Sequence, residues 1–348
     1  MTGLRALAAS MVFFHHANPF SPHGTQRIFF LFVNEFHVGV SLFFVLSGFL
    51  IYWRYESSLF KTPRWFLDYL QNRFARIYPL YFLLTTFIFA VLLVANQFTL
   101  NSEGIIIYIA NITLVKGFFN ELKFTGIAPG WSLSVEECFY FLAPFLFLRW
   151  VKFRFIIPLI FLLSGSLLVL IFSHVDFYGF FSDFHFMMIY TFFGRCFEFC
   201  AGIGMARYLK KRNDLQMSWS ATYSGLIGIL LITALLTLLG ENGNSGLEHP
   251  GGVLLNNFIL PLFIALFIYG LIKETTWIQK TLSSSLANVL GKSSYAFYLV
   301  HAGIFFSALY RYVTQNVFLI FVLLILAAMA LYYFVEKPIN EKWKAKIN

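Results

Sequence analysis

The chain has 348 residues, of which 59% are hydrophobic and only 12% are charged, and 46 of them are Phe. A soluble domain cannot cover so much apolar surface with polar groups, so the composition excludes an ordinary soluble protein. The net charge of +9 is interpreted as a consequence of membrane topology and of attraction to an anionic inner leaflet, not as a sign of nucleic-acid binding.

Long apolar runs are predicted to be helices, because every backbone N–H and C=O group in lipid needs a partner within its own segment. A window of roughly 19 residues predicts about ten membrane-spanning helices. They lie near residues 3–20, 36–53, 78–97, 131–149, 155–173, 185–207, 219–239, 253–272, 287–309 and 317–335. Residues 105–114 are too few to cross and are predicted to be an interfacial or re-entrant piece. We expect an all-α polytopic membrane protein with one transmembrane domain over residues 1–348, and no signal peptide.

The basic residues predict the orientation. If alternate connecting segments face the cytoplasm, they hold 20 of the 25 Lys and Arg residues, whereas the opposite segments hold four. Cytoplasmic loops are enriched in Lys and Arg, so both termini are predicted to be cytoplasmic.

The first predicted helix carries Arg5 and His16. A buried ionisable group costs roughly 2.5 to 3.5 kcal/mol on insertion into a membrane, so each one is a candidate functional residue. Eleven residues of helix place Arg5 and His16 on one face, about 16 Å apart along the axis, with His16 near the bilayer midplane. His15 points about 80° away from Arg5. The simpler interpretation, in which both histidines only bond to neighbouring helices, stays open.

Two arginines precede the third predicted span. If residues 73–79 are helical, Arg73 and Arg76 face the same side just before Pro79, and two planar guanidinium groups suit a phosphate or pyrophosphate. A basic loop that only sets topology is the alternative.

Further ionisable groups lie deeper in the chain. Glu136 and Glu137 lie near the start of the fourth span, where they could also simply cap the helix dipole. Arg195 and Glu198 are three residues apart and are expected to neutralise each other. His301 is expected to be structural or secondary. The three cysteines lie in spans without a set of metal ligands, so no metal site is predicted.

Seven segments, taken together and in order, resemble the acyltransferase-3 family of membrane acyltransferases. They are residues 4–16, 43–51, 73–79 and 131–140, then Arg195 with Glu198, Phe199 and Gly202, then residues 290–301 and 336–338. The chain departs from the family pattern at Ala6, where Gly is frequent, and at Cys138, where Gln is usual.

The resemblance implies an acyl-CoA donor, usually acetyl-CoA, with no bound cofactor. It implies a hydroxyl acceptor, often on a surface carbohydrate, and a multi-pass protein of the cell membrane, most simply a bacterial inner membrane. It also implies that Arg5, His16, Arg73 and Arg76 are the functional set. Some relatives carry an extra extracytoplasmic domain; none follows here, so we expect the chain to act alone or with a separate partner.

These expectations give a mechanistic hypothesis. Arg73 and Arg76 would bind the coenzyme A phosphates, Arg5 would hold the donor or His16, and His16 would act as general base or acyl carrier. Glu136 and Glu137 would orient the acceptor or relay a proton. A proton-coupled secondary transporter, which also uses buried His, Glu and Arg groups, is the alternative function. A membrane scaffold without catalysis is a third.

Overall fold

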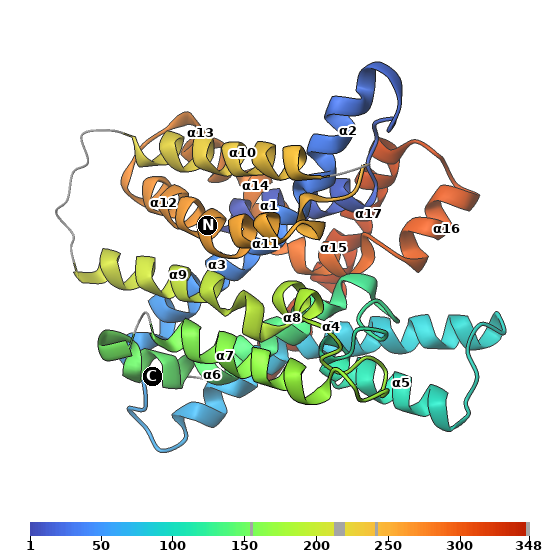
Figure 1. Ribbon diagram of the computed structural model, residues 1–348, viewed down its shortest axis with the longest axis horizontal. Helices are drawn as coiled ribbons and strands as arrows, with labels where there is room; N and C mark the ends of the chain where they lie inside the picture. The colour runs from blue at the N-terminus through green and yellow to red at the C-terminus, as the bar shows by residue number, and fades with distance from the viewer. Residues whose placement is uncertain (154–155, 212–219, 241–242, 346–348) are drawn as a thin grey trace. The chain divides into compact units, whose positions relative to one another are not determined.

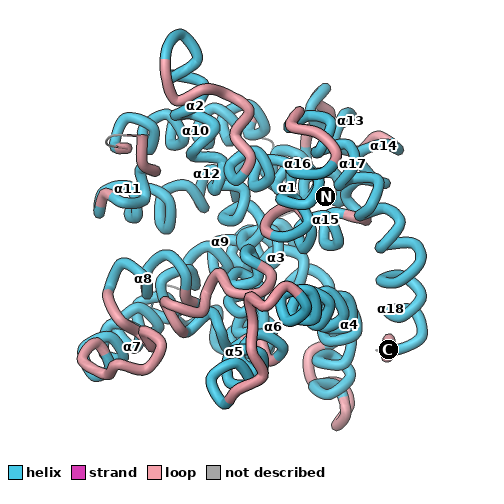
Figure 2. Tube along the Cα trace, turned by 90° about the vertical axis from the view of Figure 1, so that its right-hand side faces the viewer, coloured by secondary structure: helices cyan, strands magenta, loops and turns pink. Residues whose placement is uncertain are grey.

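The computed structural model describes residues 1–153, 156–211, 220–240 and 243–345. Helices account for most of the described chain, as Figure 2 shows, and within the described residues the only β pairing is one isolated bridge between Phe119 and Phe180. The predicted cytoplasmic residues Arg154, Arg212 and Lys346 lie outside the described residues.

Eighteen α-helices follow one another in the described chain (Figure 1). The first nine are α1 (Thr2–His16), α2 (Arg27–Asn34), α3 (Val38–Tyr55), α4 (Trp65–Val94), α5 (Ser102–Ile112), α6 (Trp131–Phe153), α7 (Ile156–Phe172), α8 (Phe184–Tyr190) and α9 (Phe192–Lys211). The second nine are α10 (Ala221–Leu239), α11 (Pro250–Leu254), α12 (Leu260–Lys273), α13 (Trp277–Leu282), α14 (Ser285–Lys292), α15 (Ser294–Val300), α16 (Ile304–Tyr312), α17 (Val317–Leu331) and α18 (Lys337–Trp343).

Seven helical segments of the described chain are long and apolar enough to cross a membrane. They are Gly24–Ser58, Trp65–Val94, Ala128–Leu148, Phe184–Lys211, Ala221–Leu239, Pro250–Lys273 and Val317–Trp343. Each overlaps one of the ten predicted spans, which confirms an all-α polytopic membrane protein. The other three predicted spans correspond to shorter helices, so the count of ten and the side of the termini stay predictions. The 11-residue α5 is short, as expected for residues 105–114.

Local sequence explains where the helices differ from the prediction. α1 ends at His16 and not at residue 20, because Asn18 precedes Pro19 and a residue before proline is disfavoured in the helical region. α4 begins at Trp65, well before the predicted residue 78, and contains Pro79 in its interior. The ninth predicted span is divided among α14, α15 and α16, with Gly303 at a φ of 70° before α16.

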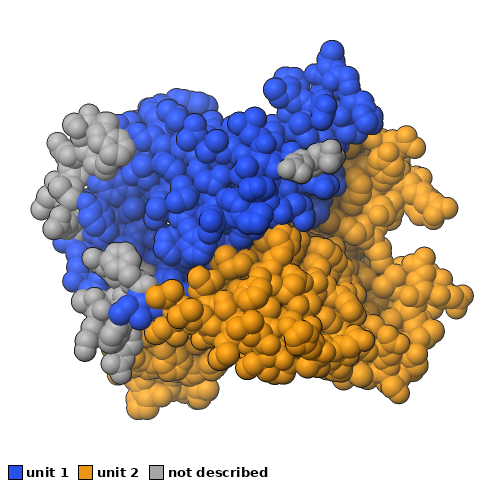
Figure 3. Space-filling model, viewed as in Figure 1, with its two compact units in different colours: residues 1–56, 150–158, 195–295 blue, residues 57–149, 159–194, 296–348 orange. Residues whose placement is uncertain are grey.

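The described chain forms two compact units, coloured separately in Figure 3. Unit 1 comprises residues 1–56, 150–158 and 195–295. In it α1 packs against α3 and α14, and α10 packs against α12 (Figure 1).

Two glycines bring α3 and α9 of unit 1 close together. A methyl group on Gly48 of α3 would collide with the carbonyl oxygen of Phe199, and one on Gly202 of α9 would collide with that of Val45. The two main chains are therefore in direct contact, as small residues allow in membrane helix packing.

Unit 2 comprises residues 57–149, 159–194 and 296–348. It contains α4, α5 and most of α6, and it includes a segment between α5 and α6 that is fixed by Lys116. The Lys116 side chain is fully buried, and its ammonium group donates to the carbonyl oxygens of Thr125 at 2.6 Å and Ile127 at 2.7 Å. Lys116 thus holds the chain that leads into α6. Because the amine is buried, its pKa falls from 10.5 to about 7.

Candidate functional site

Unit 1 contains a group of titratable side chains that we call the histidine cluster: His15, His16, Glu35 and His37. His15 and His16 are the last two residues of α1, and Glu35 and His37 belong to a short 3₁₀ turn before α3. The rings of His15 and His16 are 4.9 Å apart, and those of His15 and His37 are 5.5 Å apart, measured between centroids. His16 is exposed, His15 is half-buried, and Glu35 is only 1% exposed. The cluster therefore extends from an accessible imidazole to a buried carboxylate.

Hydrogen bonds define the tautomers in the histidine cluster. Nδ1 of His16 lies 2.8 Å from the Val12 carbonyl oxygen, and Nδ1 of His15 lies 2.6 Å from that of Asn34. A carbonyl oxygen only accepts, so each Nδ1 carries the proton and each Nε2 is the acceptor nitrogen of its ring. A neutral imidazole with Nε2 as acceptor is the form that a general base needs.

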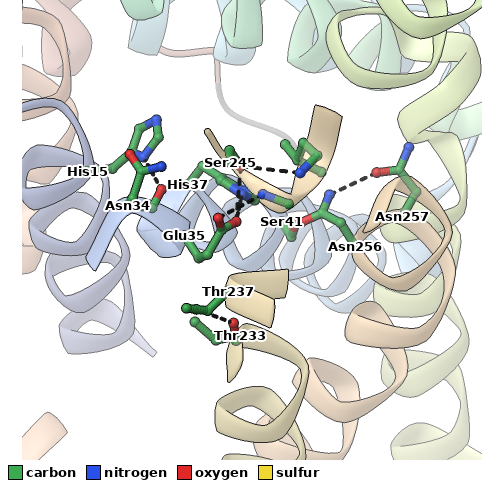
Figure 4. Close-up of polar contacts among 12 residues, drawn as sticks. His15, Asn34, Glu35, His37, Ser41, Thr233, Thr237, Ser245, Asn256 and Asn257 are labelled. Carbon is green, nitrogen blue, oxygen red and sulfur yellow. Dashed lines mark hydrogen bonds and ion pairs between the residues drawn. The ribbon is translucent and has the colours of Figure 1, made fainter. Parts of the chain in front are cut away.

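Glu35 anchors the buried end of the histidine cluster, as Figure 4 shows. Its carboxylate accepts a hydrogen bond from Nε2 of His37 at 2.8 Å, from the Ser245 hydroxyl at 3.0 Å and from the Gly246 backbone N–H at 2.8 Å. Three donors satisfy a carboxylate that would otherwise be costly to bury.

Arg5 lies on the same helix as His16, as predicted, and is half-buried. The continuous helix from Thr2 to His16 agrees with the expected axial separation of about 16 Å. His16 is the final residue of that helix, so its position relative to the bilayer midplane remains a prediction.

Unit 2 contains a second group, which we call the arginine cluster: Arg73, Arg76, Glu136, Glu137 and Tyr140. Arg73 and Arg76 belong to α4, whereas the other three belong to α6. The Arg73 guanidinium carbon lies 5.6 Å from the centre of the Tyr140 ring. The Tyr140 hydroxyl donates to Glu136, and the charges of both arginines act on Tyr140.

The arginine cluster shows how α4 and α6 combine opposite charges. The charge of Arg73 also acts on the Glu137 carboxylate. Arg73 is buried and Arg76 is half-buried. The sequence predicted the two arginines and the two glutamates separately, with the arginines in a cytoplasmic loop; their association through Tyr140 is a result of the fold. Planar guanidinium groups suit a phosphate-bearing ligand, and the role of Arg73 and Arg76 in binding the donor stays a prediction.

Arg195 and Glu198 form the buried ion pair that their spacing predicts, with Nε of Arg195 2.7 Å from the carboxylate. Arg195 also donates to Ser41 at 3.1 Å and to Asn257 at 3.3 Å, and Asn256 donates to Asn257. Ser41, Asn256 and Asn257 appear in Figure 4. The hydrogen bonds join α3, α9 and the π-helical turn before α12, as expected for an internal structural network.

His301 is fully buried in unit 2 and donates from Nδ1 to the Tyr298 carbonyl oxygen at 2.8 Å. The Tyr298 hydroxyl lies 2.8 Å from the Ser132 hydroxyl at the start of α6. These contacts give His301 a packing role beside α6, and its part in catalysis stays a prediction.

Sequence reasoning did not identify Glu35, His37 or Lys116. His37 and Glu35 lie at the edge of a predicted span. Only their proximity to His15, which the fold creates, makes them candidates for a role in the chemistry. In the described part of the chain, no group of three or more His, Cys, Asp or Glu side chains is arranged to hold a metal ion.

Comparison with known proteins identifies the family of the chain. A family model described as "Acyltransferase domain" matches residues 1–336. The O-acetyltransferase OatA of Staphylococcus aureus strain NCTC 8325 is 26% identical over 367 aligned positions, which cover 98% of this chain and 57% of that protein. OatA of strain MRSA252 gives the same values.

The chain thus spans somewhat more than half the length of these curated relatives. No solved structure matches it. The multi-pass helical fold and the bacterial relatives identify a protein of the cell membrane. Since the family model covers nearly the whole chain, the protein belongs to the acyltransferase-3 family of membrane acyltransferases.

Proposed function

We propose that this protein is an O-acetyltransferase that moves an acetyl group from acetyl-CoA to a hydroxyl group of a cell-surface carbohydrate. The observation that carries the proposal is the state of His16: an exposed imidazole whose Nδ1–H is donated to the Val12 carbonyl, which leaves Nε2 as the acceptor. The names of the relatives support O-acetyl transfer, and the family supports an acyl donor.

The reaction uses His16 to move one proton. Nε2 of His16 takes the proton of the acceptor hydroxyl while the oxygen attacks the carbonyl carbon of the thioester. The carbon–sulfur bond then breaks, and His16 returns the proton to the sulfur of coenzyme A. An acyl-imidazole on Nε2, formed before the acceptor binds, is the variant of this scheme in which His16 is the nucleophile.

The remaining residues bind and orient the substrates. Arg73 and Arg76 pair with the phosphates of the donor, because planar guanidinium groups form charge-assisted bonds with phosphate oxygens. Glu136 and Glu137 orient the acceptor hydroxyl, and Arg5 holds the donor or His16. The Tyr140 hydroxyl donates to Glu136 and the Tyr140 ring lies near Arg73, so Tyr140 connects the two arginines with the two glutamates.

Release of free thiol from acetyl-CoA by the purified protein, with and without a carbohydrate acceptor, tests the proposal. An acetyltransferase releases coenzyme A in proportion to the acetylated acceptor, whereas a proton-coupled transporter does not. His16→Ala is expected to lower turnover at least about a hundredfold, since general-base catalysis is worth roughly 10²–10⁴. His15→Ala should retain more activity than His16→Ala.

Ser10→Ala is a matched control for the first helix. The Ser10 hydroxyl donates to the Ala6 carbonyl oxygen of the same helix at 2.9 Å, so its loss should leave turnover near the wild-type rate. Turnover by His16→Ala close to that of Ser10→Ala would rule out His16 as the base.

A further inference from the structure

The histidine cluster contains two residues for which the proposed reaction gives no role, Glu35 and His37. His37 donates from Nε2 to the Glu35 carboxylate, so its Nδ1 is the acceptor nitrogen of that ring. A carboxylate that orients an imidazole in this way also favours the protonated form of nearby imidazoles, because it supplies negative charge in surroundings of low dielectric constant.

Among the charged groups on the elements that pack against α1, Glu35 differs from the others in sign. Within unit 1, α1 packs against α2, α3, α13, α14 and the turn Glu35–His37. The four helices contribute only basic groups: Arg27 on α2, Arg54 on α3, Lys280 on α13 and Lys292 on α14. Glu35 is thus the one carboxylate on these described elements. Any cation that forms at the end of α1 has Glu35 as its nearest negative charge in that set.

One hydrogen bond and two ring contacts connect Glu35 to His16. The carboxylate bonds to His37, the ring of His37 meets the ring of His15 edge to face, and the ring of His15 meets that of His16 at 4.9 Å (Figure 4 for Glu35, His37 and His15). Ser245 and the Gly246 N–H hold the carboxylate in place from a segment more than 200 residues further along the chain.

We propose that Glu35 and His37 are positioning residues for His16, and that the Glu35 carboxylate, through His37 and His15, stabilises the imidazolium that His16 forms when it takes the acceptor proton. The inference rests on the proposed role of His16 as base. Glu35 itself exchanges no proton in the reaction. Its charge and the fixed ring of His37 act on the protonation of His16 only.

The test is the protonation midpoint of His16, measured without substrate. Diethyl pyrocarbonate labels neutral imidazole, His16 is exposed, and fragment mass spectrometry separates its label from that of His15. A unit charge on the order of 10 Å away, at an effective dielectric constant of about 20, moves such a midpoint by roughly one pH unit. In the full-length protein, Glu35→Gln is expected to move the midpoint to lower pH by about that amount, since the imidazolium loses its counter-charge.

Three variants complete the experiment. Glu274→Gln removes another carboxylate of unit 1, which bonds to Ser220 and the backbone of α10, and it should leave the midpoint in place. Ser245→Ala removes one donor to Glu35 but retains the charge, and it should also leave the midpoint nearly in place. The double variant Glu35→Gln/His37→Gln retains two amides able to pair and lacks both the carboxylate and the His37 imidazole. Because a charge on His37 opposes one on His16, the midpoint of the double variant should lie at or above that of Glu35→Gln.

A folded Glu35→Gln protein with the wild-type midpoint would overturn the inference. So would failure of both Glu35→Gln and the double variant to fold, which would make the pair purely structural. Because labelling requires no acyl transfer, this outcome is separate from that of the proposed function, which fails if His16→Ala still transfers the acetyl group. In the active enzyme, Glu35→Gln should shift the acidic limb of the kcat profile to lower pH with little change in KM for the donor.

Discussion

The buried amine of Lys116 makes the stability of the protein depend on pH. Its pKa is about 7 in the folded protein against an ordinary value of 10.5, because burial disfavours the charged form. Between these two values the unfolded chain binds more protons than the folded chain, so the free energy of unfolding rises with pH in that window. The linkage relation gives an increase of about 2 kcal/mol from pH 7 to pH 9 for this residue alone.

Lys116→Met removes the titration and retains most of the volume. It also leaves the carbonyl oxygens of Thr125 and Ile127 without this donor, at a cost of about 1–3 kcal/mol each. We therefore expect the variant to be less stable than the wild type at pH 9, and the difference to narrow by about 2 kcal/mol at pH 7. Below pH 7 the difference should become constant.

Thermal unfolding in detergent micelles at pH 7, 8 and 9, followed by tryptophan fluorescence, measures the effect. A change of 2 kcal/mol corresponds to a few degrees in Tm for a protein of this size. Lys61→Met is the matched control, since Lys61 is exposed and its substitution should leave the pH dependence of Tm as in the wild type. Parallel pH profiles for the wild type and Lys116→Met would refute the argument.

Three further predictions concern the donor site, the internal ion pair and the topology. Arg73→Ala and Arg76→Ala should each raise KM for acetyl-CoA roughly tenfold or more in the thiol-release assay, because a charge-assisted bond contributes about 1.5–3 kcal/mol. Substitution by Lys should restore the affinity only in part. An unchanged KM in both Ala variants would exclude phosphate binding by these residues. Glu198→Ala should lower the free energy of unfolding by about 3–5 kcal/mol, since it leaves the buried charge of Arg195 unpaired. The double variant Arg195→Met/Glu198→Leu removes both charges and should lower that free energy by less. Reporter fusions should be cytoplasmic after Arg64 and Lys211 and extracytoplasmic after Glu121 and Gly243; the reverse pattern would disprove the orientation.

The sequence predicted the fold class because a long apolar run in lipid satisfies its backbone hydrogen bonds by forming a helix. Hydropathy alone, however, placed the start of α4 too late in the chain. Residues 65–77 are too polar for a membrane window. They nevertheless form a helix with one buried face, on which Trp65, Tyr69, Arg73 and Ile77 follow one another at intervals of four. This four-residue period is present in the sequence and predicts a longer helix that includes Arg73.

The candidate site was predictable only where its residues are close in sequence. Arg5 with His16, and Arg195 with Glu198, share a helix, so their spacing defines a common face. Glu35 depends on Ser245 and Gly246, about 210 residues away, and no local pattern indicates that partnership. The tautomer of His16 likewise depends on where α1 ends, because its Nδ1 bonds to a carbonyl of the last turn.

The reciprocal glycines of α3 and α9 restrict how this protein can evolve. A mutation that enlarges a side chain is often tolerated after a second mutation shrinks its neighbour. At Gly48 and Gly202 the obstacle is in each case a main-chain carbonyl oxygen, of Phe199 and of Val45, which every amino acid possesses. No substitution elsewhere on the facing helix can therefore make room, and each glycine can be replaced only if the two helices themselves move apart.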